Sequence, residues 1–299
     1  MLTVAALYHF TRFADPAALR AGLLQVCAEA GVKGSLLLAN EGINGTIAGS
    51  CDGIDAVLAH IRHLPGCADL HHKESPAVTL PFRRLKVRLK REIVTMGQPD
   101  VDPLARTGHY VSPQDWNALI LDPDVAVIDT RNRYETGIGS FVGAVDPGTD
   151  SFRDFPDWWQ ANKTQFAGKR IAMFCTGGIR CEKSTNYLLG QGLNEVYHLR
   201  GGILQYLEDI PQADSLWQGQ CFVFDDRVSV GHGLQPGGLT SCRACGVPLT
   251  DADRAAPGYE HGVACPQCID RYTDADRARF RERQRQIKLA AARGDRHLG

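Results

Sequence analysis

Short apolar runs alternate with amphipathic stretches through the first 97 residues of the chain. The apolar positions predict strands at residues 4–10, 33–38, 78–80 and 85–94. Two other stretches carry apolar residues at helical spacing, and they predict helices that follow Asp15-Pro16 and that span residues 52–64. This part of the chain therefore mixes both kinds of element.

Asn44-Gly45 lies between two apolar runs, where an Asn-Gly pair is a strong signal for a hairpin turn. The chain resumes a strand-like pattern at Ile47-Ala48-Gly49, which gives the order βαββαβ. This order is typical of a ferredoxin-like (acylphosphatase-like) α+β domain. We expect residues 1–97 to form such a domain.

Strands and helices alternate in a second unit, residues 109–211, and a turn-rich linker at 98–108 precedes it. The predicted strands are 124–128, 170–174 and 196–199, and the predicted helices are 113–120, a segment around 155–159, and 184–189. This alternation predicts an α/β domain with a mainly parallel sheet and helices on both faces. Asp129, Arg131 and Cys175 follow the carboxyl ends of strands, where such sheets form their sites.

A third unit, residues 212–299, contains two Cys-x-x-Cys pairs that 19 residues separate. The four cysteines are Cys242, Cys245, Cys265 and Cys268. Two such pairs can surround one Zn²⁺ tetrahedrally, so we expect a structural zinc in a small zinc-ribbon-like unit, with four free cysteines as the alternative. Four thiolates leave no open coordination position, and a catalytic zinc is therefore not expected.

The composition is that of an ordinary globular protein, with 43% hydrophobic and 22% charged residues and a net charge of −1. Global disorder is not expected, and overall charge does not indicate a partner. The sequence lacks both a run of 18 apolar residues and the pattern of a signal peptide, so we expect no membrane association. Ten dispersed cysteines indicate metal ligands or catalysis in a reducing, cytoplasmic compartment.

Basic side chains gather at two places. Six bases fall within residues 83–91, and a predicted helix from Asp274 onward is rich in arginine. Such clusters suit an RNA backbone, although a solvated face is the ordinary alternative. Amide and carboxylate groups in the loop at residues 40–46 could also read base edges. The candidate substrate-binding residues here are Asn40, Glu41, Asn44, Arg84, Lys86 and Arg88.

The segment Cys175-Thr176-Gly177-Gly178-Ile179-Arg180-Cys181 connects a predicted strand to a predicted helix. Backbone N–H groups of a glycine-bearing turn converge on one point, and the helix N-terminus adds partial positive charge. With Arg180 nearby, this environment favours a nucleophilic thiolate at Cys175, and Thr176, Gly177 and Gly178 would contact its substrate. Cys181 could resolve an oxidised Cys175 as a disulfide or simply pack. The alternative for Cys175 is a buried, inert cysteine.

The second unit resembles a rhodanese domain in Asp129-Thr130-Arg131, in the loop from Cys175 to Arg180, and in Leu199-Arg200-Gly201-Gly202. In that family the loop cysteine carries a persulfide. With the segment from Asn40 to Thr46 and the tail cysteine pairs, nearly the whole chain resembles the rhodanese-domain tRNA uridine(34) hydroxylases. That resemblance implies a tRNA-modifying oxidoreductase that uses O2 to convert uridine 34 to 5-hydroxyuridine, with tRNA as its partner.

Two other functions fit the same residues. A sulfurtransferase would pass sulfur from a Cys175 persulfide to an acceptor, and a scaffold would bind RNA without turnover. The intact Cys175 and Arg180 disfavour the scaffold. For the hydroxylase, a Cys175 thiolate could add to carbon 6 of uracil and make carbon 5 electron-rich toward an oxidant. The electron donor does not follow from the residues, since the chain lacks a dinucleotide-binding fingerprint.

Overall fold

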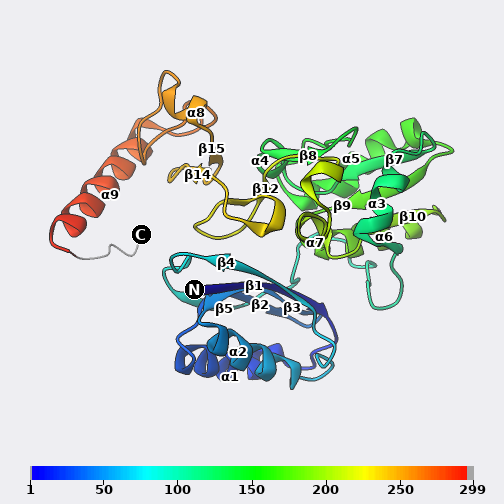
Figure 1. Cartoon of the computed structure of the whole chain (residues 1–299), viewed down its shortest axis with the longest axis horizontal. Helices are drawn as coiled ribbons and strands as arrows, with labels where there is room; N and C mark the ends of the chain where they lie inside the picture. Colours follow the sequence, from blue (N-terminus) through cyan, green and yellow to red (C-terminus); the bar gives the residue numbers. More distant parts are fainter. Residues whose placement is uncertain (1, 295–299) are drawn as a thin grey trace.

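The structure is a computed structural model that describes residues 2–294. Three units follow one another along the chain, and Figure 1 shows them in blue, in green, and in yellow to red. The first unit lies below the other two in that view, with its helices on the side away from them. The sheet of the first unit therefore turns its second face toward the rest of the molecule.

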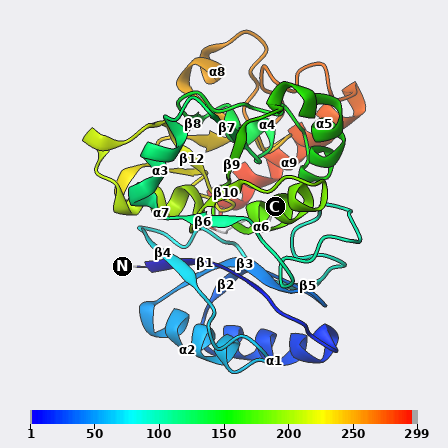
Figure 2. The same ribbon diagram turned by 90° about the vertical axis from the view of Figure 1, so that its right-hand side faces the viewer.

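A five-stranded sheet in the order β4-β1-β3-β2-β5 forms the first unit. Its strands are β1 (Leu2–Phe10), β2 (Lys33–Ala39), β3 (Gly42–Gly49), β4 (His72–Ala77) and β5 (Leu85–Leu89). Helices α1 (Pro16–Glu29) and α2 (Cys51–Arg62) cover one face, as Figure 2 shows. Leu7, Leu36 and Ile47 belong to the core between this face and the helices. The ferredoxin-like prediction is confirmed.

The predicted turn at Asn44-Gly45 is wrong. The hairpin turns at Asn40-Glu41, and Asn44-Gly45 lies inside β3, where Gly45 pairs with Leu36 of β2. A Cβ on Gly45 would lie 2.1 Å from the carbonyl oxygen of Ser35. The glycine therefore permits the close approach of two strands instead of forming a turn.

The strand predicted at residues 78–80 is also wrong, because the strand at this place is β4 and ends at Ala77. Ala77 is buried against β1, whereas Val78 is 93% exposed and has no sheet to pack on. The last strand, β5, ends at Leu89 and not at Val94 as predicted. Beyond β5 the chain leaves the sheet and runs toward the second unit.

A parallel sheet in the order β6-β10-β9-β7 forms the centre of the second unit. The elements are β6 (His109–Val111), α3 (Pro113–Ile120), β7 (Val125–Asp129), α4 (Arg133–Thr136), β8 (Gly139–Phe141), α5 (Phe155–Asn162), β9 (Arg170–Phe174), α6 (Ile179–Gly190), β10 (Val196–Leu199) and α7 (Gly202–Asp209). Val127 of β7 packs in one core with α3 and α7, and Ile128 in another with α5 and α6. Helices therefore cover both faces, as predicted. Helix α6 begins five residues before the predicted Ser184, which places Cys181 in its first turn.

The third unit contains mostly short elements. These are β11 (Trp217–Gly219), β12 (Cys221–Phe222), β13 (Ser229–Val230), β14 (Thr240–Ser241), β15 (Pro248–Leu249), α8 (Asp251–Ala255) and α9 (Asp274–Ala292). Strand β11 pairs with β8, so the chain first returns to the second unit before it reaches the cysteine pairs. Short 3₁₀ turns occur in the second unit at Phe152–Asp154 and Lys163–Phe166, and in the third unit at Gln212–Asp214 and His232–Leu234. Within residues 2–294, every helix is too short or too polar to cross a bilayer.

Candidate active site

Cys175 lies on the loop that joins β9 to α6, and its side chain is fully buried. The backbone N–H of Gly178 donates to the Cys175 sulfur at 3.1 Å. Gly178 has a φ of 104°, a region that glycine adopts without a steric penalty. This backbone conformation turns the N–H inward, toward the sulfur, at the start of the helix. The loop geometry expected from the sequence is therefore present.

The ionisation of Cys175 depends on opposing effects. Burial by itself raises the pKa of this thiol, but the side chain of Cys181, the Arg180 guanidinium and the N–H groups of Cys181 and Gly178 together lower the pKa below its ordinary value. Burial and the neighbouring Cys175 raise the pKa of Cys181. Of the two thiols, Cys175 is therefore the one that ionises more readily. A thiolate is the nucleophilic form of cysteine.

Arg180 keeps its charge beside the sulfur through a buried ion pair. Its two terminal nitrogens donate to the two carboxylate oxygens of Glu135 at 2.6 and 2.7 Å. Burial opposes ionisation of Glu135, but Arg180 lowers the pKa of that carboxyl below its ordinary value. Thr176 also donates to Glu135, at 3.3 Å. Glu135 therefore fixes the orientation of both loop side chains.

A second buried ion pair lies behind the first. Arg131 is fully buried and donates to both oxygens of Asp129, at 2.9 and 2.6 Å, and to the carbonyl oxygen of Gly139 at 2.6 Å. Its guanidinium also lies 5.1 Å from the ring centre of Trp217. These contacts hold the segment after β7, from which Glu135 projects. Their role is structural.

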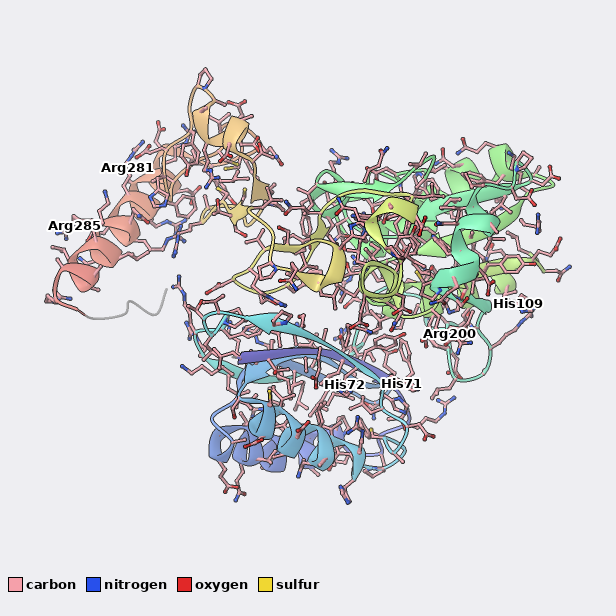
Figure 3. All side chains as sticks on the ribbon, in the orientation of Figure 1. His71, His72, His109, Arg200, Arg281 and Arg285 are labelled. Atoms are coloured by element: carbon pink, nitrogen blue, oxygen red, sulfur yellow. The ribbon has the colours of Figure 1, made fainter. Side chains whose placement is uncertain are left out.

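A cleft of about 1160 Å³ separates the Cys175 loop from the uncovered face of the first sheet. Tyr8 and Asn44 line it from the first unit, while Cys175 and Glu182 line it from the second. Figure 3 places His71 and His72 on the first unit and Arg200 on the second, and all three line the same cleft. The volume is ample for a nucleotide. Residues between 223 and 234, at the start of the third unit, also line the cleft. The candidate site is thus formed mainly between the first two units and not by the Cys175 loop alone.

Lys183 joins these two units. Its ammonium group, on a side chain that is 2% exposed, lies 2.8 Å from Glu41 and 2.7 Å from Glu92. It also donates to the carbonyl oxygen of Val94 at 2.9 Å. Lys183 lies on α6, the helix that follows the Cys175 loop, while both carboxylates belong to the first unit. This contact therefore fixes the first unit next to the Cys175 loop.

The three polar residues predicted at the first loop make internal contacts. Asn40 donates to the carbonyl oxygen of Phe13 at 3.1 Å, and Asn44 donates to that of Ile93 at 2.8 Å. Glu41 accepts from the backbone N–H of Ile93 at 2.6 Å, in addition to its ion pair with Lys183. Of the three, Asn44 lines the cleft. Base reading by these residues stays a prediction.

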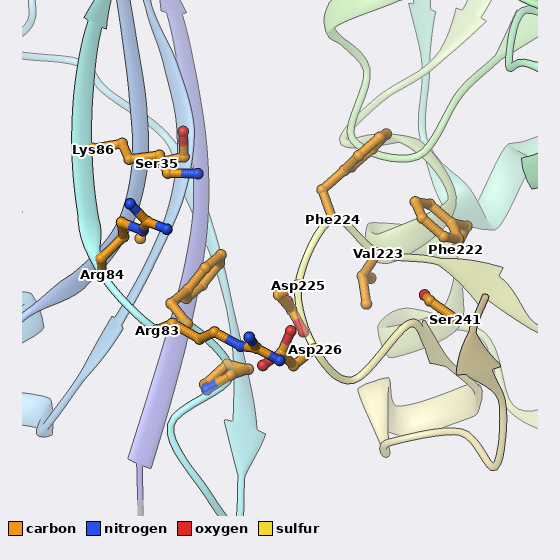
Figure 4. Close-up of a pocket in the computed structure, with 13 residues that line it drawn as sticks. Ser35, Arg83, Arg84, Lys86, Phe222, Val223, Phe224, Asp225, Asp226 and Ser241 are labelled. Carbon is orange, nitrogen blue, oxygen red and sulfur yellow. The ribbon is translucent and has the colours of Figure 1, made fainter. Parts of the chain in front are cut away.

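The predicted basic residues lie apart from Cys175. Arg84 and Lys86 line a separate cavity of about 460 Å³ between the first unit and the segment 222–226, with Asp225 and Asp226 on the opposite wall (Figure 4). Arg88 is exposed and lies outside the lining of both cavities. An RNA that contacted these three basic side chains as well as Cys175 would therefore extend over a large part of the first unit.

The four cysteines of the third unit come together. Their sulfur atoms lie within 4.8 Å of one another, and neighbouring pairs are separated by 4.0, 3.7 and 3.5 Å. A tetrahedral zinc with Zn–S bonds of about 2.3 Å requires sulfur–sulfur distances of about 3.8 Å. The cluster could therefore hold a metal ion, and its geometry and soft donor set fit zinc.

Helix α9 extends away from the other two units, and Figure 3 shows Arg281 and Arg285 along it. Several of its bases pair with acids. Arg281 contacts Glu260 at 2.6 Å, and Arg285 contacts Glu282 at 2.8 Å. These exposed pairs reduce the positive charge that the helix presents to solvent. The role of α9 as an RNA-binding arm stays a prediction.

Sequence reasoning missed three residues of the site, namely Tyr8, Tyr110 and Glu182. The alternation of β1 places Tyr8 on the face opposite Leu7, and this was readable from the sequence. No sequence signal indicated that this face would lie against the Cys175 loop. Glu182 follows Cys181 directly, but its role depends on the two tyrosines that surround it.

Comparison with known proteins identifies the first two units. Residues 2–93 match the UPF0176 acylphosphatase like domain, and residues 112–209 match the Rhodanese-like domain. A Jannaschia sp. protein named tRNA uridine(34) hydroxylase is 66% identical over 299 residues, covering 100% of this chain and 99% of that protein. A Ruegeria pomeroyi protein of the same name is 67% identical, covering 100% and 99%. One from Gluconobacter oxydans is 58% identical, covering 100% and 96%. The chain belongs to the tRNA uridine(34) hydroxylase family.

Proposed function

We propose that the chain hydroxylates carbon 5 of uridine 34 in tRNA, with O2 as co-substrate and Cys175 as the catalytic thiolate. The observation that carries this proposal is the place of Cys175, whose sulfur accepts the Gly178 N–H, in the lining of a cleft large enough for a nucleotide. The lowered pKa of Cys175 supports it. Relatives that cover the full length of the chain carry the corresponding name. Arg180 and the Gly178 N–H stabilise the thiolate, and residues 1–97 supply the opposite wall.

The chemistry follows from the electrophilic character of uracil carbon 6. The Cys175 sulfur forms a bond to carbon 6 while the carbon 5–carbon 6 π bond opens, and the electron pair moves toward carbon 5 and O4. Carbon 5 is then nucleophilic and forms a bond to O2, which with one proton gives a hydroperoxide on carbon 5. Loss of the carbon 5 proton and departure of the Cys175 thiolate from carbon 6 then restore the ring double bond. The full conversion of uridine and O2 to 5-hydroxyuridine and water consumes two electrons and two protons. The released Cys175 thiolate would cleave the O–O bond of the hydroperoxide, which leaves 5-hydroxyuridine and a sulfenic acid on Cys175, and the Cys181 thiol would condense with that acid to give a disulfide and water. We assign the reduction of this disulfide, and with it the supply of the two electrons, to a thiol reductant, two thiols of which become one disulfide.

The remaining assignments support the same activity. Thr176, Gly177 and the more distant Arg84, Lys86 and Arg88 would contact the RNA, and zinc at the four cysteines of the third unit would stabilise that unit. An RNA substrate in the cytoplasm accords with these roles. The domain boundaries proposed are residues 1–97, 109–211 and 212–299.

The test is mass spectrometry of nucleosides from tRNA incubated with the protein and a thiol, with and without O2. We expect uridine to gain one oxygen atom only with O2 and only with Cys175 intact, so Cys175→Ala abolishes the product. Full activity of that variant would refute the thiolate role. Full turnover by Cys181→Ser would refute the disulfide step alone.

A sulfurtransferase is the second candidate, because the Rhodanese-like match and the loop around Cys175 are typical of persulfide carriers. The same protein incubated with thiosulfate and cyanide distinguishes the two. Rapid formation of thiocyanate with unchanged uridine would favour sulfur transfer.

A further inference from the structure

Two carboxyl groups lie near Cys175, and their surroundings differ. Glu135 is fully buried and pairs with Arg180 through two short hydrogen bonds. Glu182 lines the cleft that also contains Cys175, and its hydrogen-bond partners are two tyrosine hydroxyls. One carboxyl is therefore paired with a cation and lies outside the lining of the cleft, and the other lines the cleft without such a cation.

The partners of Glu182 come from two units. The hydroxyl of Tyr8, on β1, donates to Glu182 Oε1 at 2.8 Å, and the hydroxyl of Tyr110, on β6, forms a second hydrogen bond. Gly178 leaves room for this arrangement, because a Cβ there would lie 2.8 Å from the Tyr8 hydroxyl oxygen. The carboxyl is thus held in one orientation by the first and second units together.

The same surroundings set the protonation of the two carboxyls. Burial raises the pKa of Glu182, the hydrogen bonds with Tyr8 and Tyr110 oppose this, and the charge of Cys175 raises it further, so that the pKa stays above its ordinary value. Arg180 lowers the pKa of Glu135 despite its burial. Neighbouring carboxyls whose pKa values are moved apart commonly divide into a proton donor and a fixed charge. Its place in the lining of the cleft, where Glu135 is not found, and the direction of its pKa together make Glu182 the candidate proton donor.

We propose that Glu182 donates a proton to O4 of the uracil ring when Cys175 adds to carbon 6, with Tyr8 and Tyr110 as positioning residues. In this step the sulfur–carbon 6 bond forms, the carbon 5–carbon 6 π bond opens, and its electron pair moves through carbon 4 to O4. O4 takes the Glu182 proton, which leaves a neutral enol and a Glu182 carboxylate. The inference deepens the proposed function and rests on the covalent addition at carbon 6.

The proposal has a consequence that needs no oxidant. Without O2 the enol returns to the ketone as Glu182 recovers the O4 proton and carbon 5 accepts a proton from water. When the adduct then breaks down, one of the two hydrogens on carbon 5 leaves as a proton and the sulfur leaves as a thiolate. Repeated addition and breakdown therefore exchange the carbon 5 hydrogen with solvent.

The experiment measures tritium release to water from an anticodon stem-loop RNA that carries [5-³H]uridine at position 34, under argon. The full chain is compared with Glu182→Gln, Glu182→Asp, Cys175→Ala and Glu195→Gln. Glu195 is exposed and outside the cleft, so it supplies a matched carboxyl-to-amide control. Alkylation of Cys175 by iodoacetamide, in the parent and in each variant that retains Cys175, reports whether the loop has kept its structure.

We expect Glu182→Gln to slow tritium release by about 100-fold, the usual effect of losing a general acid, while Cys175 alkylation stays within about twofold of the parent. Glu182→Asp should retain part of the exchange, Glu195→Gln all of it, and Tyr8→Phe should lose about tenfold because the acid is less well oriented. Exchange by Glu182→Gln at the parent rate would overturn the role of Glu182 and leave the addition intact. Absence of exchange in the parent would overturn the addition and the role of Glu182 together, whereas oxygen-dependent hydroxylation is measured separately.

Discussion

Replacing Lys183 by methionine tests whether its ion pairs hold the first unit against the Cys175 loop. The lysine side chain is 2% exposed, and the two carboxylates that it contacts, Glu41 and Glu92, are 24% and 21% exposed. Methionine fills a similar volume but leaves two carboxylates close together without their cation. The substitution therefore removes the cation of a buried cluster and retains its two carboxylates.

Loss of one partner from a buried pair costs about 3 to 5 kcal/mol, and the partial exposure of the two carboxylates places this case near the lower value, about 3 kcal/mol. We expect the first thermal transition of the variant to fall by about 10 °C. The double variant with Glu92→Gln should recover part of the loss, because only one uncompensated carboxylate remains. Glu208→Gln, which removes the carboxylate from a more exposed pair with Lys73, serves as the control.

The pH dependence gives a second measure of the same contact. Burial opposes ionisation of Glu92, but its hydrogen bond with Lys183 and those with backbone N–H groups lower its pKa in the folded state. Its contribution to stability is therefore present above the unfolded pKa and is lost as the pH falls through the lower, folded pKa. The Lys183→Met variant should lose less stability than the parent on acidification below about pH 4.

The assays are calorimetry at pH 7 and pH 3.5, together with hydrogen–deuterium exchange of residues 92–96. Faster exchange is expected in the variant, since Lys183 contacts Glu92 and the Val94 carbonyl. A free energy of unfolding within about 0.5 kcal/mol of the parent, with unchanged exchange in that segment, would refute the reasoning.

Two further predictions concern the cysteines. The rate at which iodoacetamide modifies Cys175 should rise with pH through a midpoint below about pH 8.5, the ordinary thiol value, because Cys181, Arg180 and nearby N–H groups lower the pKa of Cys175 despite its burial. Mass spectrometry of the labelled peptide measures this rate, and a midpoint at the ordinary value would contradict the prediction. Elemental analysis should find one zinc ion in the parent chain, and the Cys268→Ser variant should lose this ion and become sensitive to protease in the third unit. The Cys51→Ser variant, at an exposed cysteine outside the cluster, should retain the ion. A parent chain without zinc would refute that assignment.

The features that depend on local sequence pattern could be predicted without a structure. Alternating strands and helices predicted the parallel sheet of the second unit, and the glycine-bearing turn predicted the surroundings of Cys175. The spacing of the cysteine pairs likewise predicted a cluster of four sulfurs. These predictions succeeded because neighbours in sequence supply most of the interactions involved.

The features that depend on contacts between distant segments could not be predicted in this way. The local signal at Asn44-Gly45 predicted a turn, but the need for close approach to β2 at Gly45 keeps that pair inside a strand. Tyr8 meets Glu182 across 174 positions of sequence, and Lys183 meets Glu92 across 91. Neither contact has a periodic or compositional signal. Both contacts form where the first two units pack against each other, beside the cleft that Cys175 and the Glu182 carboxyl line together.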